Sequence, residues 1–312
     1  MTITVIGHLC LDTIRPADGI ETQSFGGIFF SVATLANLLG KNDTIHPVFG
    51  VGKTDYDGLI EKLSLYPNVD TSGIYKFNGP TNQVELTYSG NAERIECSKN
   101  ISEPIPWKKI KPYIESDIIL INMTSGFDIT LETLDEIRMN TRDNHTPIYM
   151  DVHSLTLGIR DDFTRFHRPV DYWRRWLFML HGVQMNAEEA AILSAEKLDE
   201  ENLAKHILAL NTKALVVTRG KQGCTAFIDE HKHVHRNDID GITTPNVIDS
   251  TGCGDVFASA YCAMYGTSKN ILSSVQFANT VAAAKTTSRG SNEIDKLSSF
   301  RLMEQTIEEQ AP

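Results

Sequence analysis

Along most of the chain, segments with the hydrophobic spacing of β-strands alternate with segments that have the hydrophobic spacing of α-helices. Short runs rich in β-branched residues predict buried strands, and longer runs with apolar residues at helical spacing predict amphipathic helices. The predicted strands are 2–6, 47–52, 116–122, 147–152, 181–185, 214–218 and 223–228, and the predicted helices are 28–39, 55–63, 130–140, 187–193, 200–210, 256–265 and 271–287. Strands that alternate with helices favour an α/β fold with a mostly parallel sheet covered on both faces.

One region departs from this alternation. From Gly73 to Asn100 the chain has short alternating strands with turn signals at 78–80 and 89–91. These strands are more polar than those of a buried sheet. We therefore expect a small sheet that covers one end of the main domain.

The charge balance limits the class of partner. The 312 residues include 29 Lys and Arg against 40 Asp and Glu, a net charge of −11. Nucleic-acid binders instead carry a basic patch or stripe, so we expect neither a nucleic-acid partner nor a membrane partner. The most apolar segment, 25–39, is too short to span a bilayer and contains three polar residues.

Five scattered cysteines without a C-x-x-C pair disfavour a disulfide framework and a zinc site. No charged segment followed by an apolar stretch opens the chain as in a secretory signal. We expect a cytoplasmic protein with reduced thiols.

A glycine turn before helix 256–265 carries the clearest candidate chemistry. The segment is Asp249-Ser250-Thr251-Gly252-Cys253-Gly254-Asp255, and strand-like residues 246–248 lead into it. The first turn of a helix has unpartnered N–H groups and a partial positive charge, and glycine lets a phosphate come close. Asp255 would lie beside that phosphate as a base for a hydroxyl group. The same residues would also serve as capping chemistry for a buried helix.

Two further features lie near the start of the chain. Asp12 is expected in a loop after the first strand, where ligands gather in open α/β sheets, although a solvated loop aspartate is the alternative. Gly26 and Gly27 precede helix 28–39, either because something approaches that backbone closely or because the chain turns tightly there.

Three other patterns are weak signals. Gly52-Lys53-Thr54 resembles the end of a P-loop, but Pro47 stands where the motif needs glycine. The histidines in 231–235 alternate like one face of a strand, which is more typical of a solvated face than of a metal site. A Rossmann dehydrogenase is disfavoured because no G-x-G-x-x-G follows the first strand.

The ordered motifs resemble those of the ribokinase-like (PfkB) family of carbohydrate kinases. They span Gly7 to about Gly290 and include Asp12, Gly26-Gly27, the small-sheet region, 186–189, 218–223 and the closing 249–255 segment. The resemblance implies a single ribokinase-like domain over 1–312, with a β lid formed by about 10–25 and 73–100. It also implies an ATP-dependent transfer of phosphate to an alcohol group, with magnesium as a cofactor. Activation by a monovalent cation is left open.

The resemblance also assigns roles to individual residues. Asp255 is implied as the catalytic base, with the N–H groups of Gly252, Cys253 and Gly254 as the anion hole. Phosphoryl transfer needs mainly positioning and charge stabilisation, so few other reactive groups are required. Glu189 is implied near the magnesium ion, which is held by oxygen ligands and water. The residues implied on the nucleotide side are Asn186, Thr218, Gly220, Gly223 and Asn279.

The acceptor side is implied at Asp12, Gly26, Gly27 and Ser31. Asp12 could accept hydrogen bonds from two neighbouring hydroxyls. Closure of the lid would exclude water and limit wasteful ATP hydrolysis. Exposed edges of a small lid sheet leave open a homodimer that pairs through the lids.

The chain departs from the family pattern at three positions. Cys253 replaces the usual alanine and puts a thiol beside the phosphate site, where its modification would crowd the phosphate. Ser31 replaces an asparagine that is frequent in the family. Asp151-Val152-His153 replaces the common Asp-x-Asn, so His153 receives no role. The leading hypothesis is a kinase of a small sugar or cyclitol. A nucleoside kinase of the same fold, with Phe29, Phe30 or Tyr88 against the base, and a catalytically inactive sugar-binding sensor are the alternatives.

Overall fold

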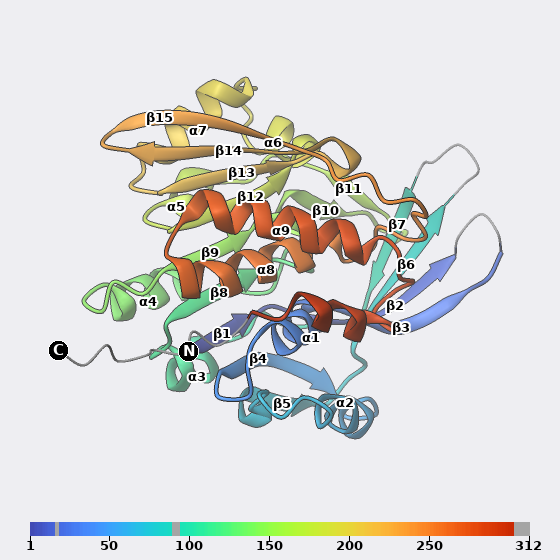
Figure 1. Cartoon of the computed structure of the whole chain (residues 1–312). Coiled ribbons are helices and arrows are strands. Elements are labelled where there is room, and N and C mark those ends of the chain that lie inside the picture. The colour runs from blue at the N-terminus through green and yellow to red at the C-terminus, as the bar shows by residue number, and fades with distance from the viewer. Residues whose placement is uncertain (16–18, 89–93, 303–312) are drawn as a thin grey trace.

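The computed structural model describes residues 1–15, 19–88 and 94–302. Its largest sheet has nine strands in the order β15-β14-β13-β12-β9-β8-β1-β4-β5 (Figure 1). Neighbouring strands from β13 to β5 run parallel, while β14 and β15 add an antiparallel hairpin at one edge. These strands are β1 (Thr2–Ile6), β4 (Thr44–Gly52), β5 (Ile74–Phe77), β8 (Ile118–Asn122), β9 (Ile148–Asp151), β12 (Gly182–Asn186), β13 (Ala214–Thr218), β14 (Gly223–Glu230) and β15 (His233–Asp240).

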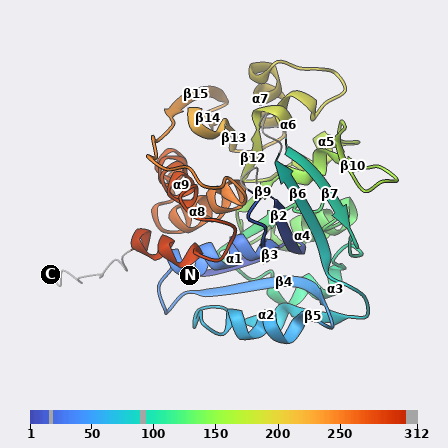
Figure 2. The same cartoon turned by 90° about the vertical axis from the view of Figure 1, so that its right-hand side faces the viewer.

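Helices cover both faces of this sheet. In Figure 2, α8 and α9 lie on one side of the strands, and α4 and α5 lie on the other. All five residues of β8 are buried, as expected for a strand covered on both faces. The helices are α1 (Ile28–Leu38), α2 (Tyr56–Leu63), α3 (Trp107–Ile110), α4 (Leu131–Thr141), α5 (Trp173–Leu177), α6 (Ala187–Ile192), α7 (Glu200–Leu208), α8 (Cys253–Ser268) and α9 (Ile271–Lys285).

A second sheet has four strands in the order β3-β2-β6-β7 and projects from one end of the main sheet (Figure 1). Its strands are β2 (Leu9–Arg15), β3 (Thr22–Gly27), β6 (Asn82–Tyr88) and β7 (Arg94–Lys99). A short hairpin of β10 (Leu157–Ile159) and β11 (Arg165–His167) lies against β7, where the N–H of Ser98 donates to the carbonyl of Phe163 at 3.0 Å. The small sheet is thus assembled from two separate parts of the chain, and the hairpin from a third part lies against it.

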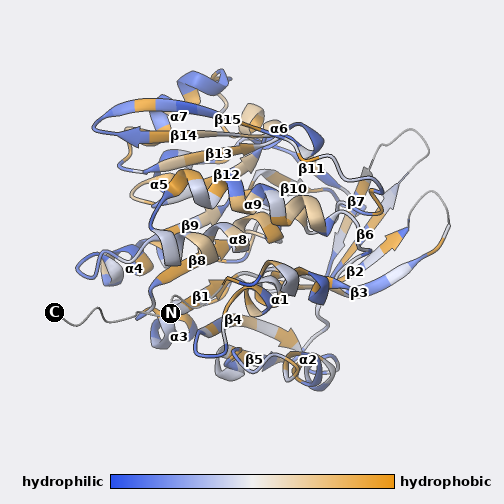
Figure 3. Cartoon of the chain, viewed as in Figure 1, coloured by the Kyte–Doolittle hydropathy of each residue, from blue (hydrophilic) through white to orange (hydrophobic). Residues whose placement is uncertain are grey.

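Hydropathy follows this arrangement. Figure 3 shows hydrophobic residues concentrated in the central strands, while β15 is largely hydrophilic. His231, His233 and His235 are all exposed on this edge hairpin. In the part of the chain that the structure describes, every helix falls short of the length and apolar character that crossing a membrane requires.

Most predicted elements are present with ends shifted by a few residues, but three details differ. Residues 246–248 form no strand, because the N–H groups of Ile248 and Asp249 turn to the carbonyl of Thr286 at the end of α9. Asp12 lies within β2 and not in a loop, and it is buried. β5 pairs with β4 of the main sheet, so the second segment of the small sheet begins at Asn82 and not at Gly73. The predicted turn at 89–91 lies outside the described residues.

Candidate active site

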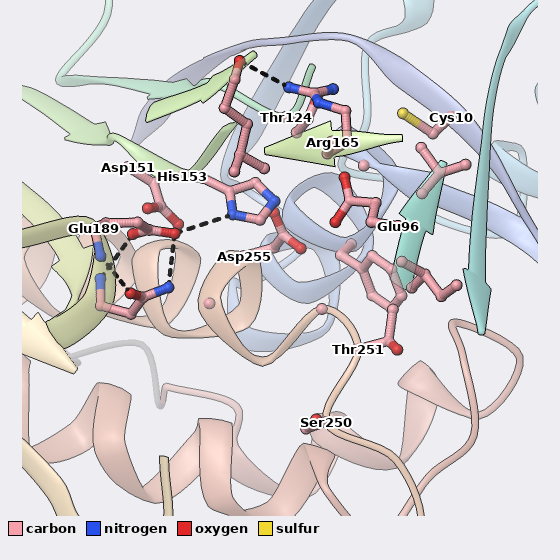
Figure 4. A pocket seen from close by; sticks show the side chains of 18 of the residues that line it. Cys10, Glu96, Thr124, Asp151, His153, Arg165, Glu189, Ser250, Thr251 and Asp255 are labelled. Carbon is pink, nitrogen blue, oxygen red and sulfur yellow. Dashed lines mark hydrogen bonds and ion pairs between the residues drawn. The ribbon is translucent and has the colours of Figure 1, made fainter. Parts of the chain in front are cut away.

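A cavity of about 690 Å³ lies between the small sheet and the carboxyl ends of the central strands. It collects residues that follow or end β8, β9, β12 and β13, which is where ligands bind in open α/β sheets. Figure 4 shows Asp151, His153 and Glu189 on one side of it and Cys10, Glu96 and Arg165 on the other, with Asp255 between them. The predicted site residues that line the cavity are Asp12, Gly27, Asn186, Glu189, Thr218, Gly252, Gly254 and Asp255.

Asp255 occupies the first turn of α8, and the neighbouring strand β8 fixes its orientation. The side-chain amide of Asn122, at the end of β8, donates to Asp255 Oδ1 at 2.6 Å and to Ser31 Oγ at 3.0 Å. Burial raises the pKa of Asp255, while the charge of His153 and the hydrogen bond from Asn122 oppose that rise. Ser31, predicted on the acceptor side, is fully buried and is not among the residues that line the cavity. Its hydroxyl oxygen instead accepts the hydrogen bond from Asn122.

Two of the three residues predicted as the anion hole line the cavity in the turn before α8. Gly252 adopts a left-handed conformation with φ of 79°, and both Gly252 and Gly254 line the cavity. The N–H of Cys253 instead donates to the carbonyl of Ser250 at 3.2 Å. Asp249 fixes the turn, because its carboxylate accepts from the N–H of Thr251 at 2.9 Å.

Glu189 and Asn186 form a capping box at the start of α6. Asn186 Oδ1 accepts from the Glu189 N–H at 2.8 Å, and the Glu189 carboxylate accepts from the backbone N–H and the side-chain amide of Asn186, each at 2.7 Å. Both carboxylate oxygens of Glu189 are therefore engaged before any ligand arrives. The capping chemistry and the implied binding role fall on the same two residues.

His153 and Asp151 complete this side of the cavity, and the sequence assigned neither of them a role. His153 Nδ1 lies 3.7 Å from Glu189 Oε1, and the side chain keeps 35% of its surface open. Burial lowers the pKa of His153, but the hydrogen bond and charge of Glu189, with the charges of Asp151 and Asp255, raise it to about 10. Burial raises the pKa of Asp151, and the charge of His153 opposes it.

Gln184, on β12, links Asp151 to the glycine turn before α8. Its side-chain amide nitrogen donates to Asp151 Oδ2 at 2.9 Å and to the carbonyl of Gly254 at 3.0 Å. The start of α8 is therefore held at a fixed place relative to the end of β9. A glutamine inside an ordinary buried strand gave no sign of this contact in the sequence.

The small-sheet side of the cavity is built around Asp12. Burial raises the pKa of Asp12 to about 8, with the charges of Asp255, Glu96 and Asp249 adding to the rise and His153 opposing it. Gly26 leaves room for this carboxyl group, because a Cβ there would lie 1.8 Å from Asp12 Oδ2. Gly26 thus accommodates Asp12, while Gly27 lines the cavity with φ of 57° at the start of α1.

Arg165 was missed by the sequence reasoning and lies beside Glu96 (Figure 4). Its guanidinium donates to the carbonyls of Ser125 at 2.9 Å and Gly158 at 3.2 Å, and to the Ser98 hydroxyl at 3.2 Å. It thereby ties the β10–β11 hairpin to β7 and to the loop after β8. A motif could not have shown this, because the partners come from distant parts of the chain.

Three predicted nucleotide-side residues lie outside the cavity lining. Asn279 on α9 donates to the carbonyl of Asp240 at 2.9 Å and joins that helix to the end of β15. Gly220 and Gly223 have φ of 53° and 89° in the turn between β13 and β14. A Cβ on Gly223 would lie 2.0 Å from the carbonyl oxygen of Ile239, so this position requires glycine for the hairpin itself.

Comparisons with known proteins agree with one another on the family. The sequence model of the pfkB family carbohydrate kinases matches residues 2–297. The cytidine kinase of Thermococcus kodakarensis is 23% identical over 280 residues, which are 85% of this chain and 88% of that protein.

Solved structures agree on the fold. The ribokinase of Thermotoga maritima superimposes with a TM-score of 0.74 at 20% identity and covers 96% of this chain and 99% of that one. An E. coli protein described as a ribokinase II, in complex with ATP and Mg²⁺, gives a TM-score of 0.72 at 17% identity and covers 96% and 98%. The resemblance and the fold expected from the sequence are confirmed: this chain is a kinase of the pfkB family of carbohydrate kinases and has the ribokinase-like α/β fold.

Proposed function

We propose that this protein uses ATP and Mg²⁺ to phosphorylate a hydroxyl group of a small sugar or cyclitol. The observation that carries the proposal is the placement of Asp255. Its carboxyl group lines the cavity in the first turn of α8, beside Gly252 and Gly254 and fixed by Asn122. This arrangement supports a reaction in which Asp255 is the base and the backbone of the glycine turn binds the phosphate.

Asp255 takes the proton of the acceptor hydroxyl as the phosphoryl group transfers. Burial raises the pKa of Asp255, which makes its ionised form a stronger base, and the charge of His153 opposes the rise. The turn at Gly252 and Gly254 receives the charge that spreads over the transferred group. Positioning then supplies most of the remaining acceleration.

The donor side offers oxygen atoms of the kind that Mg²⁺ prefers. Asn186, Glu189 and Asp151 all line the cavity there. Because both Glu189 oxygens already accept hydrogen bonds from Asn186, these residues suit a magnesium ion held through water and donor phosphates. When bound, Mg²⁺ would neutralise charge on the donor phosphates. The E. coli neighbour, in complex with ATP and Mg²⁺, supports this assignment of the donor.

The acceptor side combines carboxyl groups with a limited apolar surface. Asp12 and Glu96 line it and suit the hydroxyls of a sugar or cyclitol. Phe166 on β11 also lines it, and this aromatic ring favours a nucleoside as the second candidate, in agreement with the cytidine kinase relative. Phe29, considered from the sequence as a base-stacking ring, is buried in the core and packs against Phe25 at 5.8 Å between ring centroids.

A binding protein without catalysis is the third candidate. Such a sensor would need the acceptor side but not the base or the donor side. Asp255, the glycine turn and the Asn186–Glu189 pair are present together in one cavity, which favours an active kinase.

The test is ADP release measured with a panel of sugars, cyclitols and nucleosides. Release that depends on one class identifies the acceptor, and binding without release supports the sensor. Asp255→Asn should lower turnover by about 10²-fold or more because general-base assistance is worth that much, while ATP binding persists. Asp143→Asn, at an exposed aspartate after α4, is the matched control and should leave the rate unchanged. Full turnover by Asp255→Asn would overturn the role of this residue.

A further inference from the structure

Lys285 is a buried charge that the proposed mechanism does not use. It is the last residue of α9, and its side chain has no exposed surface. Its Nζ donates to the carbonyl of Ser288 at 3.2 Å and lies 5.6 Å from the centroid of the Phe30 ring. Among the described residues, the ammonium group has no ion-pair partner within 4.0 Å. A buried ammonium group without a paired carboxylate is costly and calls for an explanation.

The turn 249–254, which we propose as the phosphate site, packs against the same residues that surround the Lys285 ammonium group. The Phe30 ring lies directly against Gly252, since a Cβ there would approach within 2.5 Å of the ring. Asp249 joins the turn to the segment after α9, because its two carboxylate oxygens accept from the N–H of Thr251 at 2.9 Å and of Gly290 at 2.8 Å. The turn 249–254, Phe30 and the segment 285–290 thus form one packed unit around the ammonium group.

A helix cap alone does not explain this placement. A lysine at the end of a helix gains from the macrodipole and from the last carbonyls, and it can do so while exposed to water. Here the ammonium group is buried, and its charge interacts with groups in and next to the turn. Burial raises the pKa of both Asp255 and Cys253, and the positive charge of Lys285 opposes the rise at each of them.

We propose that Lys285 is a positioning residue, a built-in cation that holds the turn 249–254 in its phosphate-binding shape. The inference deepens the proposed kinase function and rests on it. A fixed ammonium group at this place supplies the charge that a bound monovalent cation could otherwise supply. Phosphoryl transfer by this chain therefore needs no added monovalent cation, which answers the question that the sequence left open.

The first measurement uses the wild-type protein. Initial rates with ATP, Mg²⁺ and the identified acceptor are recorded in tetramethylammonium chloride, and then with K⁺, Na⁺ or NH₄⁺ replacing it at constant ionic strength. We expect the same rate in all four salts within the error of the assay. Strong stimulation by K⁺, Na⁺ or NH₄⁺ would overturn the proposal.

The second measurement uses Lys285→Ala. We expect kcat to fall by about 10²-fold, the typical effect of a misplaced reacting group, with little change in the KM for ATP. Because the substitution leaves room for a small cation, K⁺, NH₄⁺ or methylammonium should restore part of the rate. Lys62→Ala is the matched control, since the Lys62 ammonium group also lies near a phenylalanine ring, 4.9 Å from the centroid of Phe29, but on α2. This control should keep the wild-type rate and respond to no cation.

Hydrogen–deuterium exchange gives a readout that is independent of activity. Amides in 249–254 and 286–291 should exchange faster in Lys285→Ala and slow again in K⁺, while amides of β8 do not change. Lys285→Met, which keeps the length of the side chain, replaces the alanine variant if that one does not fold; because it leaves no room for a cation, we expect it to be slow in every salt and to show the faster exchange in 249–254. A folded variant with wild-type kcat or wild-type exchange in 249–254, or a slow Lys285→Ala protein that no cation accelerates, would overturn the proposal. Failure of the wild-type protein to release ADP with any acceptor would instead count against the proposed function.

Discussion

Asp12 is a buried carboxyl group that we propose for recognition of the acceptor hydroxyls, and its protonation state would limit how well it can accept hydrogen bonds from them. Burial and neighbouring carboxylates raise its pKa to about 8. Only the ionised form is a pure acceptor for two hydroxyl groups. We expect kcat/KM for the acceptor to rise with pH through about 8 in the wild type. Asp12→Asn should be slower and lose this rise, with the KM for ATP unchanged.

The same variant gives a separate test by stability. Because the pKa of Asp12 increases from 3.8 in the unfolded chain to about 8 in the folded chain, folding takes up a proton between these values. The wild type therefore loses stability as pH rises through this window. The Tm of Asp12→Asn relative to wild type should increase from pH 4 to pH 8 and then level off. A difference that does not depend on pH would contradict the raised pKa.

Cys253 is less reactive than its position suggests. A thiol at a helix start is often activated, but burial raises the pKa of Cys253 to about 11 and Lys285 opposes this only in part. We expect slow alkylation by iodoacetamide at pH 7.5, measured by mass spectrometry with the partly exposed Cys97 as internal reference. Cys253→Ala should keep nearly full turnover. Rapid modification of Cys253 would show that the turn opens readily.

At the scale of elements, the pairing of β2 and β3 leaves room for the carboxyl group of Asp12 on β2 only because residue 26 on β3 is a glycine. Gly26→Ala would place a Cβ 1.8 Å from Asp12 Oδ2, so Asp12 must move. We expect kcat/KM for the acceptor to fall by about 10²-fold, since a displacement of about 1 Å in a reacting site has that effect. Steady-state kinetics against acceptor concentration measure this.

Gly58→Ala on α2 is the matched control for this substitution. A Cβ at Gly58 meets nothing within 4 Å, and alanine favours the helix by about 0.5–1 kcal/mol. This variant should be as active as wild type and slightly more stable. Equal kinetics for both glycine variants would show that Asp12 does not contact the acceptor.

The sequence predicted individual elements better than their pairing. Strands such as β8 and helices such as α8 follow from local periodicity, because burial imposes that pattern on the residues themselves. β5 and β6 have similar half-buried patterns, yet β5 joins the main sheet through pairs such as Phe49 with Ile74, and β6 joins the small sheet. The partner of a strand depends on distant residues, so local patterns could not separate the two.

At the scale of the whole molecule, the same limit applies to the site. Asp255, the glycine turn and Glu189 belong to short motifs and were predicted from them. Asn122 and Gln184 were not, because each gains its role only when the fold brings its strand to α8. His153 was left without a role because it departs from the motif, and its charge is evident only beside Glu189.

The small sheet and the turn 249–254, which we propose as the phosphate site, are in contact at the cavity, so contacts between them should control access of water. The Tyr88 hydroxyl on β6 lies 3.2 Å from Thr251 Oγ1 in the turn. A neutral hydrogen bond contributes about 1 kcal/mol, so Tyr88→Phe should weaken the closed arrangement about fivefold. We expect ADP release without acceptor to rise relative to acceptor-dependent release, because water then reaches the donor more often. Tyr56→Phe on α2, far from the turn in sequence and with its ring beneath Lys76 at 4.1 Å, is the control. If Tyr88→Phe and Tyr56→Phe show the same ratio of the two rates, the contact with Thr251 does not hold the small sheet over the donor, and exclusion of water must depend on the apolar lining around Val84 and Leu86.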